Sequence, residues 1–262
     1  MSDLTLALIQ SDIHWEDVDA NLAMFEEKIW SISDSVDILL LPESFNSGFS
    51  SNIEKIAEVP GLKTHKWLLQ MANQKNALVG GSFLVNEKGQ LFNRYMMAKP
   101  DGSFQTYDKK HLFNLSDIEK KLTPGTNRII INYNEWRICP MICYDLRFPS
   151  WSQNFVHEDG KTDFDLLIYS ANWPKPRINA WDTVLNARAI ENQCYVAGIN
   201  RVGVDGNGLE YPGHSAVIDY TGKVFDIKIE EGIIIQKISK KPLDTFREKL
   251  PFLSDLHSTV FD

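Results

Sequence analysis

The sequence predicts one α/β domain that spans residues 1–262 and contains mixed β-sheets. Segments with strand-like and helix-like patterns alternate along the chain, and hairpins occur between them. No linker, internal repeat or low-complexity segment interrupts this order. Several strands are apolar on both faces, which is typical of strands that are covered on both sides. The number of such strands favours two sheets that pack face to face under a cover of helices.

The N-terminal segments predict a strand, a helix and a second strand. Residues 4–10, LTLALIQ, have the composition of a strand. Residues 36–45, VDILLLPESF, begin with a continuous apolar run that is typical of a buried strand. Between them, residues 15–32 predict an amphipathic helix, because one helical face carries Val18, Leu22, Phe25 and Ile29.

The next segments predict a helix followed by a hairpin. Residues 65–76, HKWLLQMANQKN, have the pattern of a helix. Residues 77–85 and 90–100 predict two strands, and the turn between them covers residues 86–89.

The middle of the chain returns to strands that flank one helix. Residues 128–143 predict two strands around a turn at residues 132–135. Residues 164–173, FDLLIYSANW, predict another buried strand. The helix predicted at residues 180–193 is followed by a strand at residues 194–200.

The C-terminal part predicts one more hairpin and a tail. Residues 213–229 predict a hairpin that turns at Thr221 and Gly222. The tail, residues 242–262, predicts a short helix and an extended arm.

The composition argues against several kinds of partner and location. The net charge is −8 and charges of both signs are interspersed, whereas nucleic acids and anionic membranes attract a basic face. Three cysteines form no disulfide framework, which favours a reducing compartment. The start of the chain is a poor signal peptide, and no apolar run reaches the roughly 20 residues of a membrane span. We therefore expect a cytoplasmic protein that needs no metal or other cofactor.

Three ionisable residues follow strand-like segments, at the sheet edge where ligands bind in α/β proteins. Glu43 is either an exposed loop residue or a general base. Lys109 and its neighbour Lys110 are either both solvated, or one of them points inward as a fixed cation. Cys143, in the run ICPMICYDLRFP, is either an inert buried thiol or a nucleophile.

Taken together, these residues form a set that can cleave a C–N bond. A thiol attacks as the thiolate and therefore needs a base, which Glu43 would supply. Attack on an amide creates an oxyanion, which Lys109 and a backbone N–H beyond Cys143 would stabilise. Such chemistry requires neither a metal nor a cofactor.

The motifs LLLPESF, YDKKHLF and MICYDLRFP resemble those of the nitrilase superfamily, the carbon–nitrogen hydrolases that use a Glu-Lys-Cys triad. The resemblance covers nearly the whole chain. It implies that Glu43 is the general base, Cys143 the nucleophile and Lys109 the triad lysine, with Lys110 as the alternative. It also implies that Glu119 helps to position the substrate.

The same resemblance implies an α-β-β-α sandwich that pairs into an eight-layered homodimer. The tail, about residues 241–262, would then be an arm that contacts the partner. Within this superfamily, the segments ANWP and NARAIENQ look most like the ω-amidase branch. Those enzymes release ammonia from the terminal amide of 2-oxo acids such as 2-oxoglutaramate and 2-oxosuccinamate.

The alternative activities are those of a deaminated-glutathione amidase, an N-carbamoyl amidohydrolase and a true nitrilase. The expected substrate is therefore a small-molecule amide. In the mechanism that the resemblance implies, the backbone N–H of Tyr144 completes the oxyanion site. A 2-oxo diacid monoamide needs a cation for its carboxylate. The candidate substrate-binding residues are Phe45, Asn172, Trp173 and Arg201, together with Arg147, Arg177 and Phe49.

Overall fold

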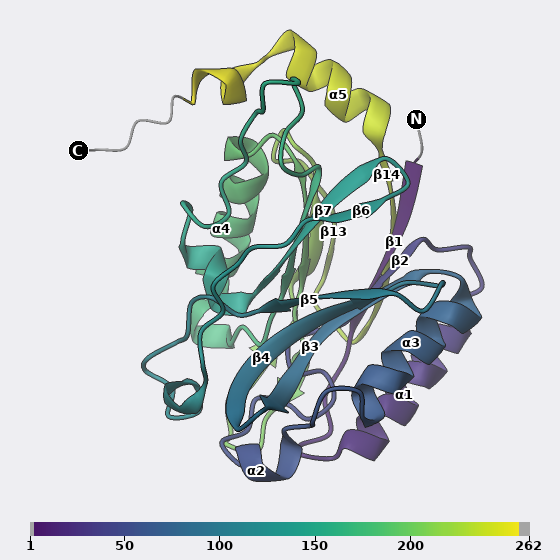
Figure 1. Ribbon diagram of the computed structural model, residues 1–262, viewed down its shortest axis with the longest axis vertical. Helices are drawn as coiled ribbons and strands as arrows, with labels where there is room; N and C mark the ends of the chain where they lie inside the picture. Colours follow the sequence, from purple (N-terminus) through teal and green to yellow (C-terminus); the bar gives the residue numbers. More distant parts are fainter. Residues whose placement is uncertain (1–2, 257–262) are drawn as a thin grey trace.

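Two six-stranded sheets form the centre of the protein, in a computed structural model that describes residues 3–256 (Figure 1). The first sheet has the strand order β14-β1-β2-β3-β4-β5, and the second has the order β13-β12-β9-β8-β7-β6. The first sheet contains β1 (Asp3–Gln10), β2 (Ile38–Leu40), β3 (Leu78–Glu87), β4 (Gln90–Ala98), β5 (Phe104–Asp108) and β14 (Gly232–Ser239). The second contains β6 (Ile131–Tyr133), β7 (Trp136–Ile142), β8 (Leu166–Ser170), β9 (Tyr195–Ile199), β12 (Ser215–Ile218) and β13 (Val224–Lys228).

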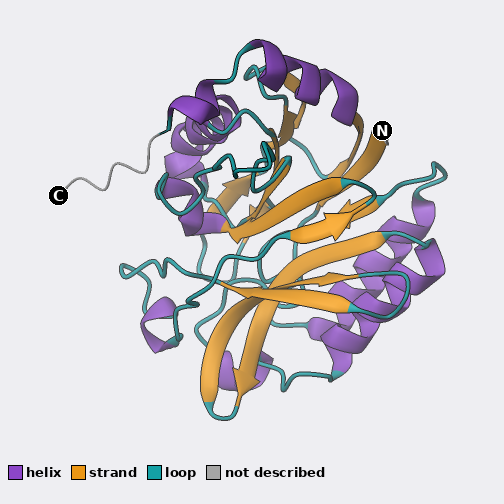
Figure 2. Ribbon diagram, turned by 45° about the horizontal axis from the view of Figure 1, so that its top comes forward, coloured by secondary structure: helices purple, strands orange, loops and turns teal. Residues whose placement is uncertain are grey.

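Helices cover the outer faces of both sheets. Figure 1 shows α1 and α3 side by side against the first sheet and α4 against the second, and in Figure 2 helices flank the strands on opposite sides. The helices are α1 (Val18–Ser31), α2 (Ile53–Ile56), α3 (Lys63–Lys75), α4 (Ile178–Glu191) and α5 (Lys240–Lys249). Short 3-10 helices are η1 (Glu119–Lys121), η2 (Cys143–Arg147), η3 (Lys175–Arg177) and η4 (Phe252–Asp255). The fold is therefore the predicted α-β-β-α sandwich.

Side chains alternate between two cores, which explains the continuous apolar runs. In β1, Leu6 and Leu8 pack between the sheets, whereas Ala7 and Ile9 pack under α1 and α3. Successive side chains of a strand point to opposite faces, so a strand in this position is apolar at every residue. In β7, likewise, Ile138 packs between the sheets while its neighbour Cys139 packs under α4.

The predicted helices and hairpins are confirmed, and their ends have local causes. The side chain of Asp17 caps α1 by accepting a hydrogen bond from the Ala20 N–H. Asn76 ends α3 in a left-handed conformation (φ 50°). Lys88 and Gly89, both with positive φ, form the turn between β3 and β4.

The strand predicted in the apolar run that ends at Pro42 is shorter than expected, because β2 covers only Ile38–Leu40. Pro42 has no N–H to donate to a neighbouring strand, so the chain leaves the sheet there. The following loop stays buried because β3 passes close beneath it. A Cβ on Gly81 would lie 2.8 Å from Leu41 Cβ and 2.9 Å from Phe45 Cδ1. Glycine at position 81 therefore lets the loop that carries Glu43 lie directly on the sheet.

Four strands lie in segments that the sequence did not assign to strands. They are β5, β14 and a small two-stranded sheet made of β10 (Val202–Val204) and β11 (Glu210–Pro212). β14 follows β13 of the second sheet but pairs with β1 of the first, so the chain crosses between the sheets at that point. The pairing of β14 depends on a distant partner and leaves only a weak local pattern, whereas β5 pairs with the neighbouring β4, and β10 with β11.

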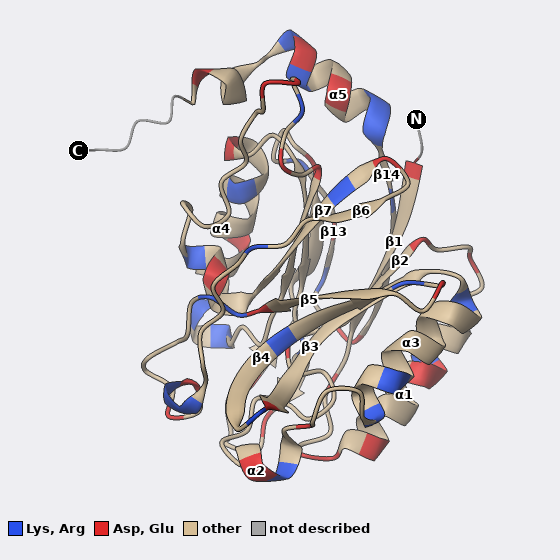
Figure 3. Ribbon diagram, in the orientation of Figure 1, with Lys and Arg blue, Asp and Glu red and all other residues tan. Residues whose placement is uncertain are grey.

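Charged residues of both signs are interspersed over α3, α4 and α5 (Figure 3). No helix within residues 3–256 has the length and apolar character needed to cross a membrane. The predicted C-terminal arm begins as α5 and η4, and residues 257–262 of it lie outside the described part of the chain.

The fully buried carboxylate of Asp165 ties α5 to the second sheet. Its Oδ1 lies 2.8 Å from Lys240 Nζ, 2.7 Å from Arg247 Nη1 and 3.1 Å from Arg137 Nη2. Burial by itself raises the pKa of Asp165, but the three cations outweigh it and lower the pKa to about 2. The ionised carboxylate therefore stabilises the folded state.

We expect Asp165→Asn to lower the free energy of unfolding by about 3 kcal/mol at neutral pH, because it leaves one buried and two partly buried cations without their shared anion. The pKa in the folded state lies below that in the unfolded state. The stabilisation by wild-type Asp165 is therefore complete above about pH 4, and about 2 kcal/mol of it is lost as the pH falls toward about 2. Urea unfolding at several pH values measures the difference between the two proteins.

The exposed residue Glu158 offers a matched control, and Glu158→Gln should change the stability by less than about 0.5 kcal/mol. A difference between wild type and Asp165→Asn that stays constant down to about pH 3 would contradict the role given to this carboxylate.

Candidate active site

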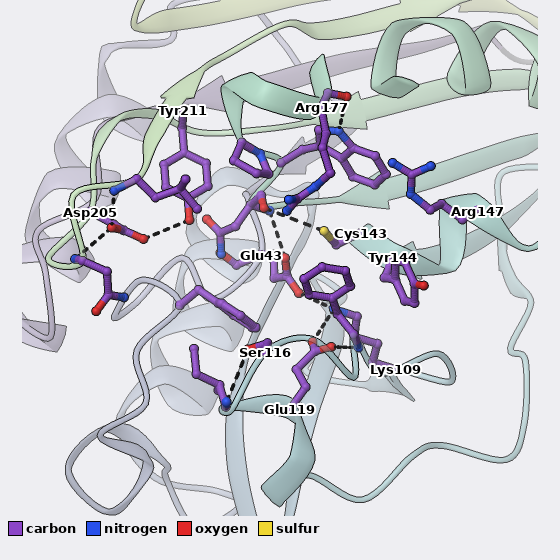
Figure 4. A pocket seen from close by; sticks show the side chains of 18 residues that line it. Glu43, Lys109, Ser116, Glu119, Cys143, Tyr144, Arg147, Arg177, Asp205 and Tyr211 are labelled. Atoms are coloured by element: carbon purple, nitrogen blue, oxygen red, sulfur yellow. Dashed lines mark hydrogen bonds and ion pairs between the residues drawn. The ribbon is translucent and has the colours of Figure 1, made fainter. Parts of the chain in front are cut away.

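The three ionisable residues singled out in the sequence line one cavity of about 210 Å³ (Figure 4). Glu43 lies in the loop after β2, Lys109 directly after β5, and Cys143 directly after β7. β2 and β5 belong to the first sheet and β7 to the second, so the cavity lies where strands of both sheets end. Glu43 and Lys109 are almost completely buried, and Cys143 is partly exposed.

Glu43 is held by donors from both sheets. Asn93 of β4 donates its Nδ2–H to Glu43 Oε1 (2.8 Å). The backbone N–H of Asn172, just beyond β8, donates to Oε2 (2.9 Å), and its side-chain Nδ2–H donates to the Glu43 carbonyl (2.9 Å). These bonds fix the orientation of the carboxylate inside the cavity.

Lys109 lies between two carboxylates. Its Nζ is 2.9 Å from Glu43 Oε1 and 2.5 Å from Glu119 Oε1. Glu119 Oε2 accepts a hydrogen bond from the backbone N–H of Phe113, which fixes this second carboxylate. Lys110 instead places its Nζ over the ring of Trp151, at 5.5 Å from the centroid. Lys109 is therefore the lysine that faces the cavity.

The pKa shifts have physical causes that can be separated. Burial raises the pKa of the Cys143 thiol well above its usual value, and the charge of Glu43 raises it further, against the effect of Lys109. Burial lowers the pKa of Lys109, but Glu119 and Glu43 outweigh it and the net shift is upward. Burial also raises the pKa of Glu119, while Lys109 opposes that shift. At neutral pH the site therefore holds a protonated thiol beside a charged lysine, and the thiol needs a base to become reactive.

The nucleophile candidate sits on a strained turn. Cys143 has a positive φ of 43°, which is uncommon for a residue with a side chain, where β7 ends and η2 begins. Its Sγ lies 3.9 Å from the carbonyl oxygen of Asn172. This turn directs the sulfur into the cavity instead of into the core (Figure 4).

The fully buried carboxylate of Asp145 joins this turn to the segment that carries Lys109. It accepts hydrogen bonds from Tyr107 Oη (2.7 Å), the His111 N–H (2.9 Å) and the Ile142 N–H (3.1 Å). In the sequence, only the position of Asp145 two residues after Cys143 indicated that its carboxylate could support the site. Asp145 does not pair with Arg147, which lies over the ring of Trp173 instead.

The structure corrects two of the predicted substrate-binding residues. Phe45 lies in the core under α1 and α3, where its ring contacts Phe25 and Trp67, and not on the cavity wall. Arg201 is fully buried and does not line the cavity, because it lies behind Tyr211 (4.7 Å from Cζ to the ring centroid) and donates from Nη2 to Asp12 Oδ1 (2.9 Å).

Other cavity residues come from both predicted and unassigned segments. The predicted residues Asn172, Trp173, Glu119 and Tyr144 line the cavity, as do Phe49, Arg147 and Arg177. The β10–β11 segment, which the sequence did not assign, adds Asp205, Asn207, Leu209 and Tyr211. Cys139 and Cys194 are buried free thiols that do not line the cavity. Within residues 3–256, no group of three or more His, Cys, Asp and Glu side chains is arranged to hold a metal ion.

Comparison with known proteins agrees with this fold. A family profile described as carbon-nitrogen hydrolase matches residues 5–248. The chain therefore belongs to the carbon–nitrogen hydrolase family of the nitrilase superfamily, whose members include amidases.

Similarity to individual proteins places the chain with the ω-amidase branch. It is 40% identical over 258 residues to the omega-amidase YafV of Yersinia enterocolitica, covering 97% of each chain. It is 31% identical to the 2-oxoglutaramate amidase of Bacillus subtilis, covering 98% of this chain and 99% of the relative.

A solved structure is also similar over its whole length. It is XC1258 from Xanthomonas campestris, described as a CN-hydrolase superfamily protein with an arsenic adduct in the active site. The TM-score is 0.96 at 39% identity, and each chain is covered completely. The chain described here is thus an amidase with a nitrilase-type fold.

Proposed function

We propose that this amidase hydrolyses the terminal amide of 2-oxo acid monoamides, such as 2-oxoglutaramate, through an acyl-enzyme on Cys143. The observation that carries the mechanism is the meeting of Glu43, Lys109 and Cys143 on one cavity. The substrate class is supported by the 2-oxoglutaramate amidase and the omega-amidase among the relatives. The small size of the cavity suits a short linear amide.

In the first half-reaction, Glu43 takes the thiol proton and the sulfur of Cys143 attacks the amide carbon. The oxyanion that forms is stabilised by the Lys109 ammonium and by the backbone N–H of Tyr144. Glu43 then gives its proton to the departing nitrogen, so that ammonia leaves and a thioester remains.

In the second half-reaction, Glu43 takes a proton from water, and the hydroxide attacks the thioester. The same donors stabilise the second oxyanion. The C–S bond breaks, the proton on Glu43 returns to sulfur, and the product is a carboxylic acid. One water is consumed and one ammonia is released in each cycle. Glu119 acts by holding Lys109 at the oxyanion.

We further propose that the chain works in the cytoplasm as a homodimer. Three free thiols in the described part of the chain support a reducing compartment. The family resemblance supports the dimer.

The substrate class is tested by the kcat/KM values of the purified chain. We expect 2-oxoglutaramate and 2-oxosuccinamate to have higher values than N-carbamoyl amino acids and simple nitriles, measured by ammonia release. Deaminated glutathione is followed in parallel by its disappearance. The Cys143→Ala variant provides the background for each compound. A preference for a carbamoyl compound or for deaminated glutathione would refute the proposed substrate class.

A further inference from the structure

Two guanidinium groups at the cavity have no anionic partner within the described chain. Arg147 lies at the end of η2 and Arg177 at the end of η3, and both line the cavity. Both residues are exposed, and no hydrogen bond or ion pair joins either guanidinium to another residue in the range 3–256. A guanidinium that lines a cavity and makes no such bond within the protein is available to bind an anionic ligand.

Aromatic rings hold these two side chains in place. The Arg177 Cζ lies 5.1 Å from the centroid of the Phe113 ring, and the Arg147 Cζ lies 4.9 Å from that of Trp173. Figure 4 shows the Arg177 side chain reaching toward the middle of the cavity, whereas Arg147 lies at its margin. Trp173 also donates its Nε1–H to the Arg177 carbonyl (2.8 Å), which anchors η3 beside the cavity.

The other charges of the cavity already have partners. Lys109 pairs with Glu43 and Glu119. On the opposite side, Asp205 Oδ1 accepts hydrogen bonds from the N–H groups of Asn207 and Leu209, both at 2.9 Å. Its Oδ2 accepts one from Tyr211 Oη (3.0 Å). An anionic group of a substrate is therefore repelled by the Asp205 side and attracted by the side with the arginines.

We propose that Arg177 binds the carboxylate of the substrate at the end remote from the amide, and that Arg147 adds a weaker attraction from the cavity margin. This inference rests on the proposed function, because it assumes an amide substrate that Cys143 attacks. A guanidinium offers two parallel donors that match the two oxygens of a carboxylate. The Phe113 ring reduces the rotamer freedom that such binding would otherwise cost.

Two matched substrate pairs isolate the contribution of the carboxylate. 2-Oxoglutaramate differs from 4-oxopentanamide, and glutaramate from pentanamide, only in a carboxylate that is replaced by a methyl group. The ratio of kcat/KM within each pair measures the preference for an anionic substrate. The second pair lacks the oxo group and therefore does not depend on the identification of the substrate as a 2-oxo acid.

We expect Arg177→Gln to lower kcat/KM for both carboxylate compounds by roughly 10- to 100-fold, mainly through a higher KM, as for the loss of a charge-assisted hydrogen-bonded pair. The values for the two neutral amides should stay within about twofold, because the reacting groups are unchanged. Arg177→Lys should retain part of the preference, and Arg147→Gln should reduce it less than Arg177→Gln.

Lys175 provides the matched control. It belongs to the same 3-10 helix and carries the same charge, but it pairs with Glu210 (2.8 Å) and does not line the cavity. Lys175→Gln should therefore leave the preference for carboxylate substrates within about twofold of wild type.

Three results would overturn the assignment of Arg177. They are a wild-type enzyme that does not favour the carboxylate compounds, an Arg177→Gln variant with an unchanged ratio, and an equal loss in Lys175→Gln. A larger loss in Arg147→Gln would transfer the assignment to that residue. A different result would show that the proposed substrate class is wrong. In that case glutaramate would be hydrolysed better than 2-oxoglutaramate, but Arg177→Gln would still reduce the preference for carboxylate substrates.

Discussion

Cys143→Ala is expected to lower kcat for amide hydrolysis by at least about 10⁴-fold, because it removes the sulfur that forms the acyl-enzyme. In the described part of the chain, Cys143 is the single thiol on the cavity wall. Its pKa is raised by burial, so the sulfur reacts only after proton transfer within the site. Ammonia release measures the loss. Mass spectrometry of the acid-quenched wild type should detect an added acyl group that the variant lacks.

Cys139 offers a close control for this prediction. It lies on β7, the same strand that leads to Cys143, but its side chain packs under α4. Cys139→Ala should cost roughly 1 kcal/mol of stability and leave kcat almost unchanged. If Cys143→Ala kept even a tenth of the wild-type kcat, or if no acyl group could be trapped, covalent catalysis at this residue would be refuted.

Glu43→Gln is expected to lower kcat by about 10³-fold, because the same carboxylate moves a proton in both half-reactions. The amide keeps the size of the side chain but cannot take the thiol proton. In addition, the NH₂ group of the introduced glutamine cannot accept a hydrogen bond. In the position of Oε2 it would face the Asn172 N–H, and in the position of Oε1 it would face the donors of Asn93 and Lys109. Single-turnover measurements of acyl-enzyme formation and decay separate the two half-reactions, and both should be slow.

Glu58 is a partly buried carboxylate outside the cavity and serves as the control. It accepts hydrogen bonds from Thr64 and Asn46 and does not line the cavity. Glu58→Gln should therefore change stability but not the rate of the chemical step. If Glu43→Gln formed the acyl-enzyme at the wild-type rate, Glu43 would act only in hydrolysis of the thioester. That result would contradict the mechanism, in which Glu43 acts in both half-reactions.

Local patterns in the sequence predicted much of the fold. The apolar runs at β1, β7 and β8 and the amphipathic pattern of α1 each reflect burial, which acts on one segment at a time. The crossing of the chain into β14 and the β10–β11 sheet went unassigned. β14 depends on a partner far along the chain, because it pairs with β1. β10 and β11 pair with each other, and β11 contributes Tyr211 to the cavity wall.

The substrate-binding residues show a second limit. Phe45 and Phe49 are four residues apart in one buried loop, and only the second lines the cavity. Arg201 and Arg177 both follow motif-like segments, yet Arg201 is buried against Asp12 while Arg177 reaches the cavity. Which way a side chain points from a loop is decided by packing against other elements, and residue type alone does not contain that information.

The sequence by itself determined that strands buried on both faces alternate with helices, and that a carboxyl and a thiol group each follow a strand, with a pair of lysines between them in the chain. These properties depend on the order of residues within short segments. Only the tertiary structure decided that strands of two different sheets end at one cavity, and that two arginines there have no anionic partner among residues 3–256. The reason is that such proximity arises from how the sheets pack against each other, a contact between residues far apart in the chain.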